Sequence, residues 1–432
     1  MNCDMTKIRN RIVGIIFIVF LTVMIILVLL GAQRKMEGRE TQDYTEWDAM
    51  VYYPLDVREE SDVKQTVWQG ISDKIEMMET KVEQNVTTTF FFRIPFVFRK
   101  KMCDKLLGLD MTTSLTAGEN DISDFSDIVL TYEGTYLGCV VDDIDISKEM
   151  DNVITFGKQM EAEGRNFLFF ETPGKYVGNE IYQNHSAEKE AELLQAFEAN
   201  GLDLFRVTGA IEEEGLDFCS LFFKTDHHWL PSTGIWADGL LCEELNGRYG
   251  YHFDTSVFEM SNYETTVLEG RALGSLGKKV TEVYDCEKED FPIILPRYNT
   301  DLEVFISGSN RNETVCGSME NVLFDVSVFD EPNCYLRNDY GFYGYSDRAL
   351  ITVHNSKVDD GSHILMIKES YANCMIPYLA AVVEDLDVID LRHFGGSLQA
   401  YIDETNPDTV VMVYGIGAFQ EEEIEGGPFD FR

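Results

Sequence analysis

The chain has 432 residues, of which 44% are hydrophobic and 12% aromatic, so it is long enough for one large or two medium domains. Its 76 acidic and 35 basic residues give a net charge of −41. Such a surface repels nucleic-acid phosphates and argues against DNA or RNA as a partner. The nine cysteines have no CxxC spacing, so they indicate neither a zinc site nor a redox motif.

The first predicted element is a membrane anchor. Residues 12–32, "IVGIIFIVFLTVMIILVLLGA", contain no charged residue and are long enough to cross a bilayer as a helix. We expect an uncleaved single-pass helix behind a short cytoplasmic tail (1–11), because Leu30 does not suit a signal-peptide cleavage site. Basic residues flank both ends, so the positive-inside rule does not set the orientation. A polar stalk (33–90) then leads to a predicted extracytoplasmic domain (91–432) at the cell membrane.

Short apolar runs alternate with helical patterns from about residue 128, which is typical of an α/β domain. Residues 246–350 interrupt this rhythm; they are rich in Gly, Asn, Tyr and Asp, and we expect an irregular insertion that shapes a substrate surface. The predicted strands are 166–176, 202–207, 363–370, 386–394 and 408–415, and the predicted helices are 186–201, 231–247, 371–383 and 398–406.

The stretch "TDHHW" places Asp226, His227 and His228 together just before a predicted helix. Three interpretations compete: a metal site, the acid and base of a catalytic triad, or a polar corner that only satisfies its neighbours. In an extended segment, Asp226 and His228 point the same way and His227 points the opposite way. Adjacent histidines then do not converge on one ion, and no third ligand is placed nearby, so we predict no metal.

Ser370 stands where a predicted buried strand turns directly into a helix. Its hydroxyl is therefore expected at the carboxyl edge of the sheet, where α/β proteins place their ligands. The amides and dipole of the following helix would favour negative charge beside it. Serine needs a base to attack an ester at neutral pH, and imidazole suits that task. The alternative is a plain helix-capping serine.

These residues resemble a known family. "TDHHW" with "ILMIKESYANCMIPYLA", "ALGSLGKKV" and "DYGFYGYSDRALITVHN" is similar to the DHHW group of SGNH-hydrolase-like proteins, which is related to the alginate O-acetyltransferases of the AlgJ and AlgX type. The resemblance covers roughly residues 90–415. It implies a three-layer α/β/α fold with a mostly parallel sheet, with Ser370 as nucleophile, His228 as base and Asp226 as its partner. Moving residues 363–415 ahead of 166–245 restores the ordinary SGNH order, so the chain looks circularly permuted.

The oxyanion donors are less clear, because the usual Gly and Asn donors have no clean counterpart. We predict the Ser370 amide together with Arg392, which follows the strand after the serine. Asn373 and Tyr371 are weaker candidates. A salt bridge explains Arg392 equally well, and helix packing explains Asn373 and Tyr371.

The resemblance implies an O-acetyltransferase acting on a cell-surface or exported polysaccharide through an acetyl-serine, with no cofactor. It also implies a multi-spanning membrane acyltransferase as the partner that delivers the acetyl group. Two alternatives remain open at this point: a carbohydrate acetyl-esterase, and a non-catalytic surface protein that binds or assembles glycans.

Overall fold

The computed structural model describes residues 128–130, 137–139, 141, 143, 145–176, 184–280, 288–308, 311–334, 336–420 and 427–431. The predicted tail, anchor and stalk lie outside these residues. Within the described part of the chain, no helix is long and apolar enough to cross a membrane.

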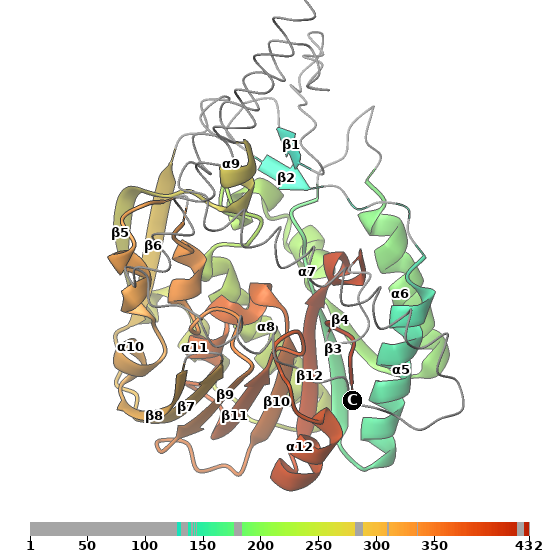
Figure 1. Ribbon diagram of the computed structural model, residues 1–432. Helices are drawn as coiled ribbons and strands as arrows, with labels where there is room; N and C mark the ends of the chain where they lie inside the picture. Colours follow the sequence, from blue (N-terminus) through green and yellow to red (C-terminus); the bar gives the residue numbers. More distant parts are fainter. Residues whose placement is uncertain are drawn as a thin grey trace, which may run out of the picture. The chain divides into compact units, whose positions relative to one another are not determined.

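An eight-stranded sheet in the order β4-β3-β12-β10-β11-β9-β7-β8 forms the centre of the described structure (Figure 1). The first five strands of this order run parallel, and β9, β7 and β8 continue the sheet in antiparallel pairs. The strand bounds are β3 Asn166–Thr172, β4 Asp203–Arg206, β7 Leu302–Gly308, β8 Arg311–Gly317, β9 Leu350–Asn355, β10 His363–Lys368, β11 Asp385–Ile389 and β12 Thr409–Gly415.

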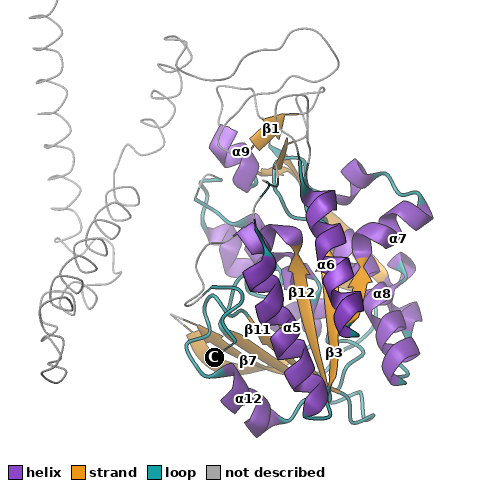
Figure 2. Cartoon of the chain, turned by 90° about the vertical axis from the view of Figure 1, so that its right-hand side faces the viewer, coloured by secondary structure: helices purple, strands orange, loops and turns teal. Residues whose placement is uncertain are grey.

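Helices cover both faces of this sheet (Figure 2). Successive residues of a strand face opposite sides of the sheet. Alternate residues of an uninterrupted apolar run such as 167–170 therefore pack into the cores on the two faces of the sheet. Phe167 and Phe169 pack with α5 (Ser147–Ala162), α6 (Ser186–Asn200) and α12 (Leu398–Thr405). Leu168 and Phe170 pack with α7 (Val207–Glu214) and α8 (Pro231–Tyr249) on the other side. The predicted mostly parallel α/β architecture is therefore confirmed, and its layers are helix, sheet and helix.

The chain reverses direction across the sheet at β10. It crosses from β10 to β11 on one side and returns to β12 on the other. Such a switch point opens a crevice at the carboxyl ends of the strands, where ligands bind in open α/β sheets. Residues 369 and 370 follow the end of β10 and therefore lie at this position. If β10, β11 and β12 are numbered 1 to 3, and β3 and β4 are numbered 4 and 5, the five parallel strands lie in the order 2-1-3-4-5. This is the strand order of one common doubly wound sheet.

The expectation of an irregular segment at 246–350 was wrong. This part contains β7, β8 and the start of β9, which widen the central sheet, and a separate antiparallel ribbon of β5 (Tyr263–Ala272) and β6 (Glu289–Pro296). Strand β5 in particular was not predicted because much of it is solvent-exposed and lacks the apolar alternation of a half-buried strand. Short helices α9 (Ser275–Val280) and α10 (Met319–Val322) also lie in this part of the chain. Far upstream of it, β1 (Ile128–Leu130) and β2 (Leu137–Cys139) form a separate two-stranded sheet.

The predicted helix over 371–383 is also shorter than expected. The chain forms a 3₁₀ turn over Ser370–Cys374, followed by one helical turn, α11 (Ile376–Leu379), which has Pro377 at its start. Nearly every side chain from 371 to 383 is buried, so packing and not helical propensity fixes this segment. A turn of five residues is too short to have a substantial helix dipole. Negative charge beside Ser370 would therefore be stabilised only by the nearby backbone amides of this turn.

Candidate active site

The "TDHHW" motif lies in a bent loop and not in an extended segment. A bridge between Phe222 and Trp229 closes the loop, and the Leu230 amide donates to the Leu221 carbonyl at 2.8 Å. Inside the loop, the Phe223 amide donates to the His228 carbonyl at 3.1 Å. The bend turns the Asp226 carboxylate back toward the backbone amide of His228, which donates to Oδ1 at 3.0 Å. Local turn chemistry of Asp therefore creates this geometry.

The structure brings Asp226, His228 and Ser370 together in one hydrogen-bonded chain. Asp226 Oδ1 and His228 Nδ1 are 2.5 Å apart, and His228 Nε2 and Ser370 Oγ are 2.8 Å apart. Ser370 opens the turn that follows β10, whereas the other two residues come from the loop before α8. This arrangement suits proton transfer from the hydroxyl to the imidazole, with the carboxylate holding the ring in the required tautomer.

The Asp226 carboxylate is held as an anion. Burial raises the pKa of this carboxyl, but the charges of His228 and His227 and the hydrogen bonds from His228 outweigh it and hold the pKa well below its usual value. Its second oxygen, Oδ2, accepts the Ser275 amide at 2.8 Å. A Cβ on the neighbouring Gly274 would lie 2.3–2.5 Å from the backbone and Cβ of Asp226, so only glycine allows this approach.

The prediction that His227 points away from Asp226 was wrong, because the loop bends and strand alternation does not apply. The rings of His227 and His228 are 3.8 Å apart between centroids, and His227 Nδ1 lies 3.4 Å from Asp226 Oδ1 and 2.6 Å from Ser275 Oγ. Asp226, His227 and His228 each have one potential ligand atom, and these three atoms lie within 4.8 Å of one another. This spacing is compatible with a metal ion. Both ring nitrogens of His228 are, however, already engaged with Asp226 and Ser370. The donor set therefore fits a proton relay better than a metal site.

Aromatic rings fix the position of the His228 imidazole. The Tyr340 ring stacks on it at 3.9 Å between centroids with a 10° angle between planes, and the Tyr371 ring lies 5.3 Å away. The Tyr340 hydroxyl and the Trp229 indole N–H both donate to the Tyr371 carbonyl, at 2.9 and 2.8 Å. The Tyr371 hydroxyl in turn donates to the His227 carbonyl at 2.5 Å. These contacts tie the histidine loop to the serine turn.

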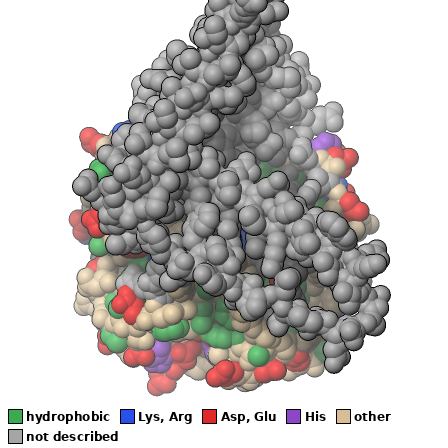
Figure 3. Space-filling view, in the orientation of Figure 1, with side chains coloured by type: hydrophobic (Ala, Val, Ile, Leu, Met, Phe, Trp, Pro, Cys, Tyr) green, Lys and Arg blue, Asp and Glu red, His purple; other side chains and the backbone are tan. Residues whose placement is uncertain are grey.

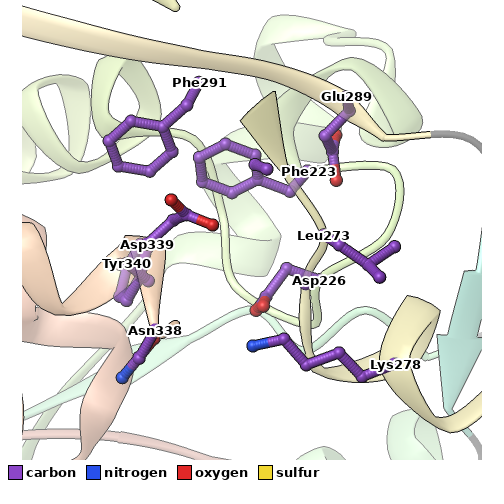
Figure 4. Close-up of a pocket in the computed structure, with 11 residues that line it drawn as sticks. Phe223, Asp226, Leu273, Lys278, Glu289, Phe291, Asn338, Asp339 and Tyr340 are labelled. Carbon is purple, nitrogen blue, oxygen red and sulfur yellow. The ribbon is translucent and has the colours of Figure 1, made fainter. Parts of the chain in front are cut away.

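A small pocket lies on the side of Asp226 that faces residues 272–274, Lys278, residues 289–291 and residues 338–340 (Figure 4). Its walls combine two phenyl rings, Phe223 and Phe291, with the charged groups of Lys278 and Asp339. The Lys278 ammonium donates to the Arg337 carbonyl at 2.6 Å. Burial lowers the pKa of Lys278, while the Asp226 and Asp339 charges act in the opposite direction. The pocket therefore places a cation near the triad carboxylate.

Arg392 and Asn373 are placed differently from the oxyanion role predicted for them. Arg392 makes a two-point ion pair with Asp390, with Nε 2.9 Å from Oδ1 and Nη2 2.8 Å from Oδ2. Asn373 accepts from the Lys368 ammonium at 2.6 Å and donates to Asp347 at 3.1 Å. The salt-bridge alternative for Arg392 is thus the geometry observed, and Asn373 belongs to a buried network beneath the serine turn.

This network centres on Lys368, the last residue of β10, whose side chain is fully buried. Its ammonium lies 3.1 Å from Asp347 and 3.3 Å from Asp390. Burial raises the pKa of the Asp347 carboxyl, but the Lys368 and Arg392 charges prevail and the pKa falls below its usual value. Two cations thus balance two carboxylates, which anchors the turn that carries Ser370.

Sequence reasoning missed several residues that build the site: Gly274, Ser275, Tyr340, Lys368, Asp347 and Lys175. Most lie within segments noted as similar to the family, "ALGSLGKKV" and "DYGFYGYSD", or beside them. Nothing in their spacing indicated which of them would surround Asp226, His228 and Ser370, because they come from several separate parts of the chain.

Part of the chain is similar to a known protein family. Residues 217–389 match the DHHW protein family. This DHHW segment contains Asp226, His228 and Ser370, and the remaining described strands lie on both sides of it in sequence. The comparison with curated proteins gave no match.

Solved structures with TM-scores above 0.5 share the fold. PatB1 of Bacillus cereus, in a structure with a sulfonyl adduct, has 16% sequence identity and a TM-score of 0.56, covering 71% of this chain and 98% of its own. A DHHW family protein from Eubacterium siraeum DSM 15702 has 16% identity and a TM-score of 0.54, covering 73% and 96%. The O-acetyltransferase domain of Pseudomonas putida AlgJ has 11% identity and a TM-score of 0.42, covering 71% and 99%.

The metal and proton-relay interpretations predict different losses of activity when His227 and His228 are substituted. Because His228 Nε2 contacts the Ser370 hydroxyl at 2.8 Å, His228→Asn should reduce acetyl-ester hydrolysis by about 10³-fold or more. His227→Asn removes the contacts of the imidazole to Ser275 and Asp226 and its packing on the His228 ring, but it keeps the His228–Ser370 hydrogen bond, and we expect a loss of less than about tenfold. A chelator should leave the wild-type rate unchanged. Equal losses in both variants, with chelator inhibition reversed by zinc, would establish the metal site instead.

Proposed function

We propose that this protein is a serine acyl-ester enzyme, and specifically an O-acetyltransferase that modifies a cell-surface or exported polysaccharide. The observation that carries the proposal is the Asp226–His228–Ser370 hydrogen-bond chain at the switch point of the sheet. The match to the DHHW family and the fold shared with PatB1, whose structure holds a sulfonyl adduct, support it.

In the first half-reaction, Ser370 Oγ attacks the carbonyl carbon of an acetyl donor while its proton moves to His228 Nε2. Asp226 stabilises the imidazolium through Nδ1. The carbonyl oxygen becomes an oxyanion, and the amides at the start of the Ser370–Cys374 turn are the nearest candidates to stabilise it. Collapse of this intermediate breaks the bond to the donor oxygen, which takes the proton from His228 and leaves. Ser370 then carries the acetyl group as an ester.

In the second half-reaction, a sugar hydroxyl attacks the acetyl-serine and gives its proton to His228 Nε2. Collapse of the second tetrahedral intermediate expels Ser370 Oγ, which takes that proton back. Water in place of the sugar turns the same steps into an esterase reaction, so the acceptor alone separates the two activities.

The charge of the chain favours a neutral or basic acceptor. At −41, the protein repels polyanionic chains at low ionic strength, and acidic side chains are spread over the uncovered part of the face in Figure 3. A neutral glycan meets no such barrier. We therefore choose neutral oligosaccharides as the first acceptors to test.

The setting of the enzyme is part of the proposal. The uncharged run at 12–32 supports a single-pass anchor with the catalytic domain outside the cytoplasm. A multi-spanning membrane acyltransferase would then deliver the acetyl group across the bilayer. The strand order 2-1-3-4-5, with β10–β12 placed first, supports circular permutation of an SGNH-type domain.

The deciding experiment follows the acetyl group. The full-length protein is incubated with p-nitrophenyl acetate, and peptide mass spectrometry should locate one acetyl group on Ser370. Addition of a neutral oligosaccharide should discharge this ester and yield acetylated sugar faster than free acetate. Free acetate alone would identify an esterase. A protein that binds glycans but never gains the acetyl group would be a non-catalytic surface protein.

A further inference from the structure

Lys175 is a buried lysine that the proposed reaction does not use. It lies three residues beyond β3, and only 1% of its surface is exposed. Its ammonium donates to three backbone carbonyls: Phe223 at 2.5 Å, Lys224 at 2.8 Å and Asp226 at 3.0 Å. A lysine ammonium has three donors, so this set of acceptors matches its capacity.

Glu289, the first residue of β6, binds the same loop through its amides. One carboxylate oxygen accepts the Lys224 amide at 2.5 Å, and the other accepts the Thr225 amide at 2.6 Å and the Thr225 hydroxyl. Burial raises the pKa of Glu289, whereas these hydrogen bonds and the Lys175 charge oppose that rise. A buried cation thus holds the carbonyls of residues 223, 224 and 226, and a half-buried carboxylate holds the amides of residues 224 and 225.

Residues 223–226 need such support because little regular structure holds them. The Phe222–Trp229 bridge closes the ends of the loop, but residues 224–228 form bends without strand pairing. Asp226 must nevertheless keep His228 within 2.5 Å, and a displacement of about 1 Å in such a relay costs about 10²-fold in rate.

We propose that Lys175 and Glu289 are positioning residues for the acyl-transfer reaction, fixing residues 223–226 so that Asp226 orients His228 toward Ser370. This inference rests on the proposed function for its kinetic consequence. The arrangement of the loop itself is measurable without any substrate.

The test uses Lys175→Met, which keeps the chain length but removes the ammonium, in the full-length protein labelled with ¹⁵N-histidine. The readout is the low-field NMR resonance of the His228 Nδ1 proton shared with Asp226, assigned by its loss in Asp226→Asn. We expect Lys175→Met to weaken or remove this resonance. We also expect kcat for acetyl-ester hydrolysis to fall about 10- to 100-fold, with KM changed by less than about twofold.

The matched control is Lys148→Met, the same substitution at an exposed position of α5 outside the histidine loop, and it should leave the resonance and kcat unchanged. Glu289→Gln provides a second variant with near-native volume should Lys175→Met fail to fold, and it should show the same losses. A folded Lys175→Met or Glu289→Gln protein with a native resonance and native kcat would overturn the inference. A wild type that shows the resonance but no acyl transfer would instead refute the proposed function, with the NMR result still deciding the positioning role.

Discussion

Ser370→Ala is expected to abolish acetyl-ester hydrolysis and acetyl labelling, with a fall in kcat of about 10³-fold or more. The reason is geometric. Ser370 Oγ is the hydroxyl that His228 Nε2 contacts, at 2.8 Å, and the substitution removes the atom that we propose accepts the acetyl group. Removal of one hydroxyl from the half-buried Ser370 leaves the surrounding turn to be held by Tyr371, Trp229 and Lys368, so the melting temperature should change little.

The control is Ser307→Ala on β7, where the hydroxyl donates to Asn312 of the neighbouring strand at 2.7 Å. It should retain full activity. A sulfonyl fluoride reagent gives an independent measurement, because it should label the wild type and Ser307→Ala on Ser370 and leave Ser370→Ala unlabelled. Retained hydrolysis in folded Ser370→Ala would assign the nucleophile to another residue.

Asp238→Asn is expected to stabilise the protein, and the gain should grow with pH. Asp238 lies on α8 with no exposed surface, and neither carboxylate oxygen has a hydrogen-bond partner among the described residues. Burial raises the pKa of this carboxyl well above its usual value. The folded state therefore keeps the proton, whereas the unfolded chain releases it above about pH 4.

The sign of the effect follows from this difference in proton binding. Below the pKa of the unfolded chain, Asp238 is protonated in both states and ionisation costs no stability. Between that pKa and the raised folded pKa, the wild type loses up to about 1.4 kcal/mol of unfolding free energy for each pH unit. Asparagine does not ionise, so the variant escapes this loss. We expect a gain near zero at pH 4 that rises to at most about 4 kcal/mol at pH 7.

Thermal unfolding of wild type and Asp238→Asn across this pH range measures the effect. Glu243→Gln is the matched control, because it neutralises an exposed acid on the same helix and should give a small difference. A gain of equal size at pH 4 and pH 7 would mean that the Asp238 carboxyl is ionised, or partnered, in the folded protein.

Local sequence determined most of the α/β rhythm. The apolar runs at 166–172, 363–368 and 409–415 became β3, β10 and β12, because such runs are buried on both faces of a parallel sheet. The helix over 186–200 ends at Gly201, which adopts the left-handed conformation with φ of +68° that a helix end favours. Asp226, His228 and Ser370 were also chosen from residue type and placement, because few side chains can supply an acid, a base and a nucleophile.

Tertiary structure alone decided how these side chains meet. The alternation of side chains along an extended strand predicted that His227 points away from Asp226. This was wrong because the Asp226 carboxylate accepts the backbone amide of His228, and the loop bends at that point. The role of Arg392 depended on whether Asp390 was within reach, and two hydrogen bonds from its guanidinium show that it is. Lys175, Glu289 and Tyr340 contact the histidine loop from three other parts of the chain. Such contacts follow from long-range packing and carry no sequence periodicity, so a single sequence determines the elements but not the side chains that hold the histidine loop in place.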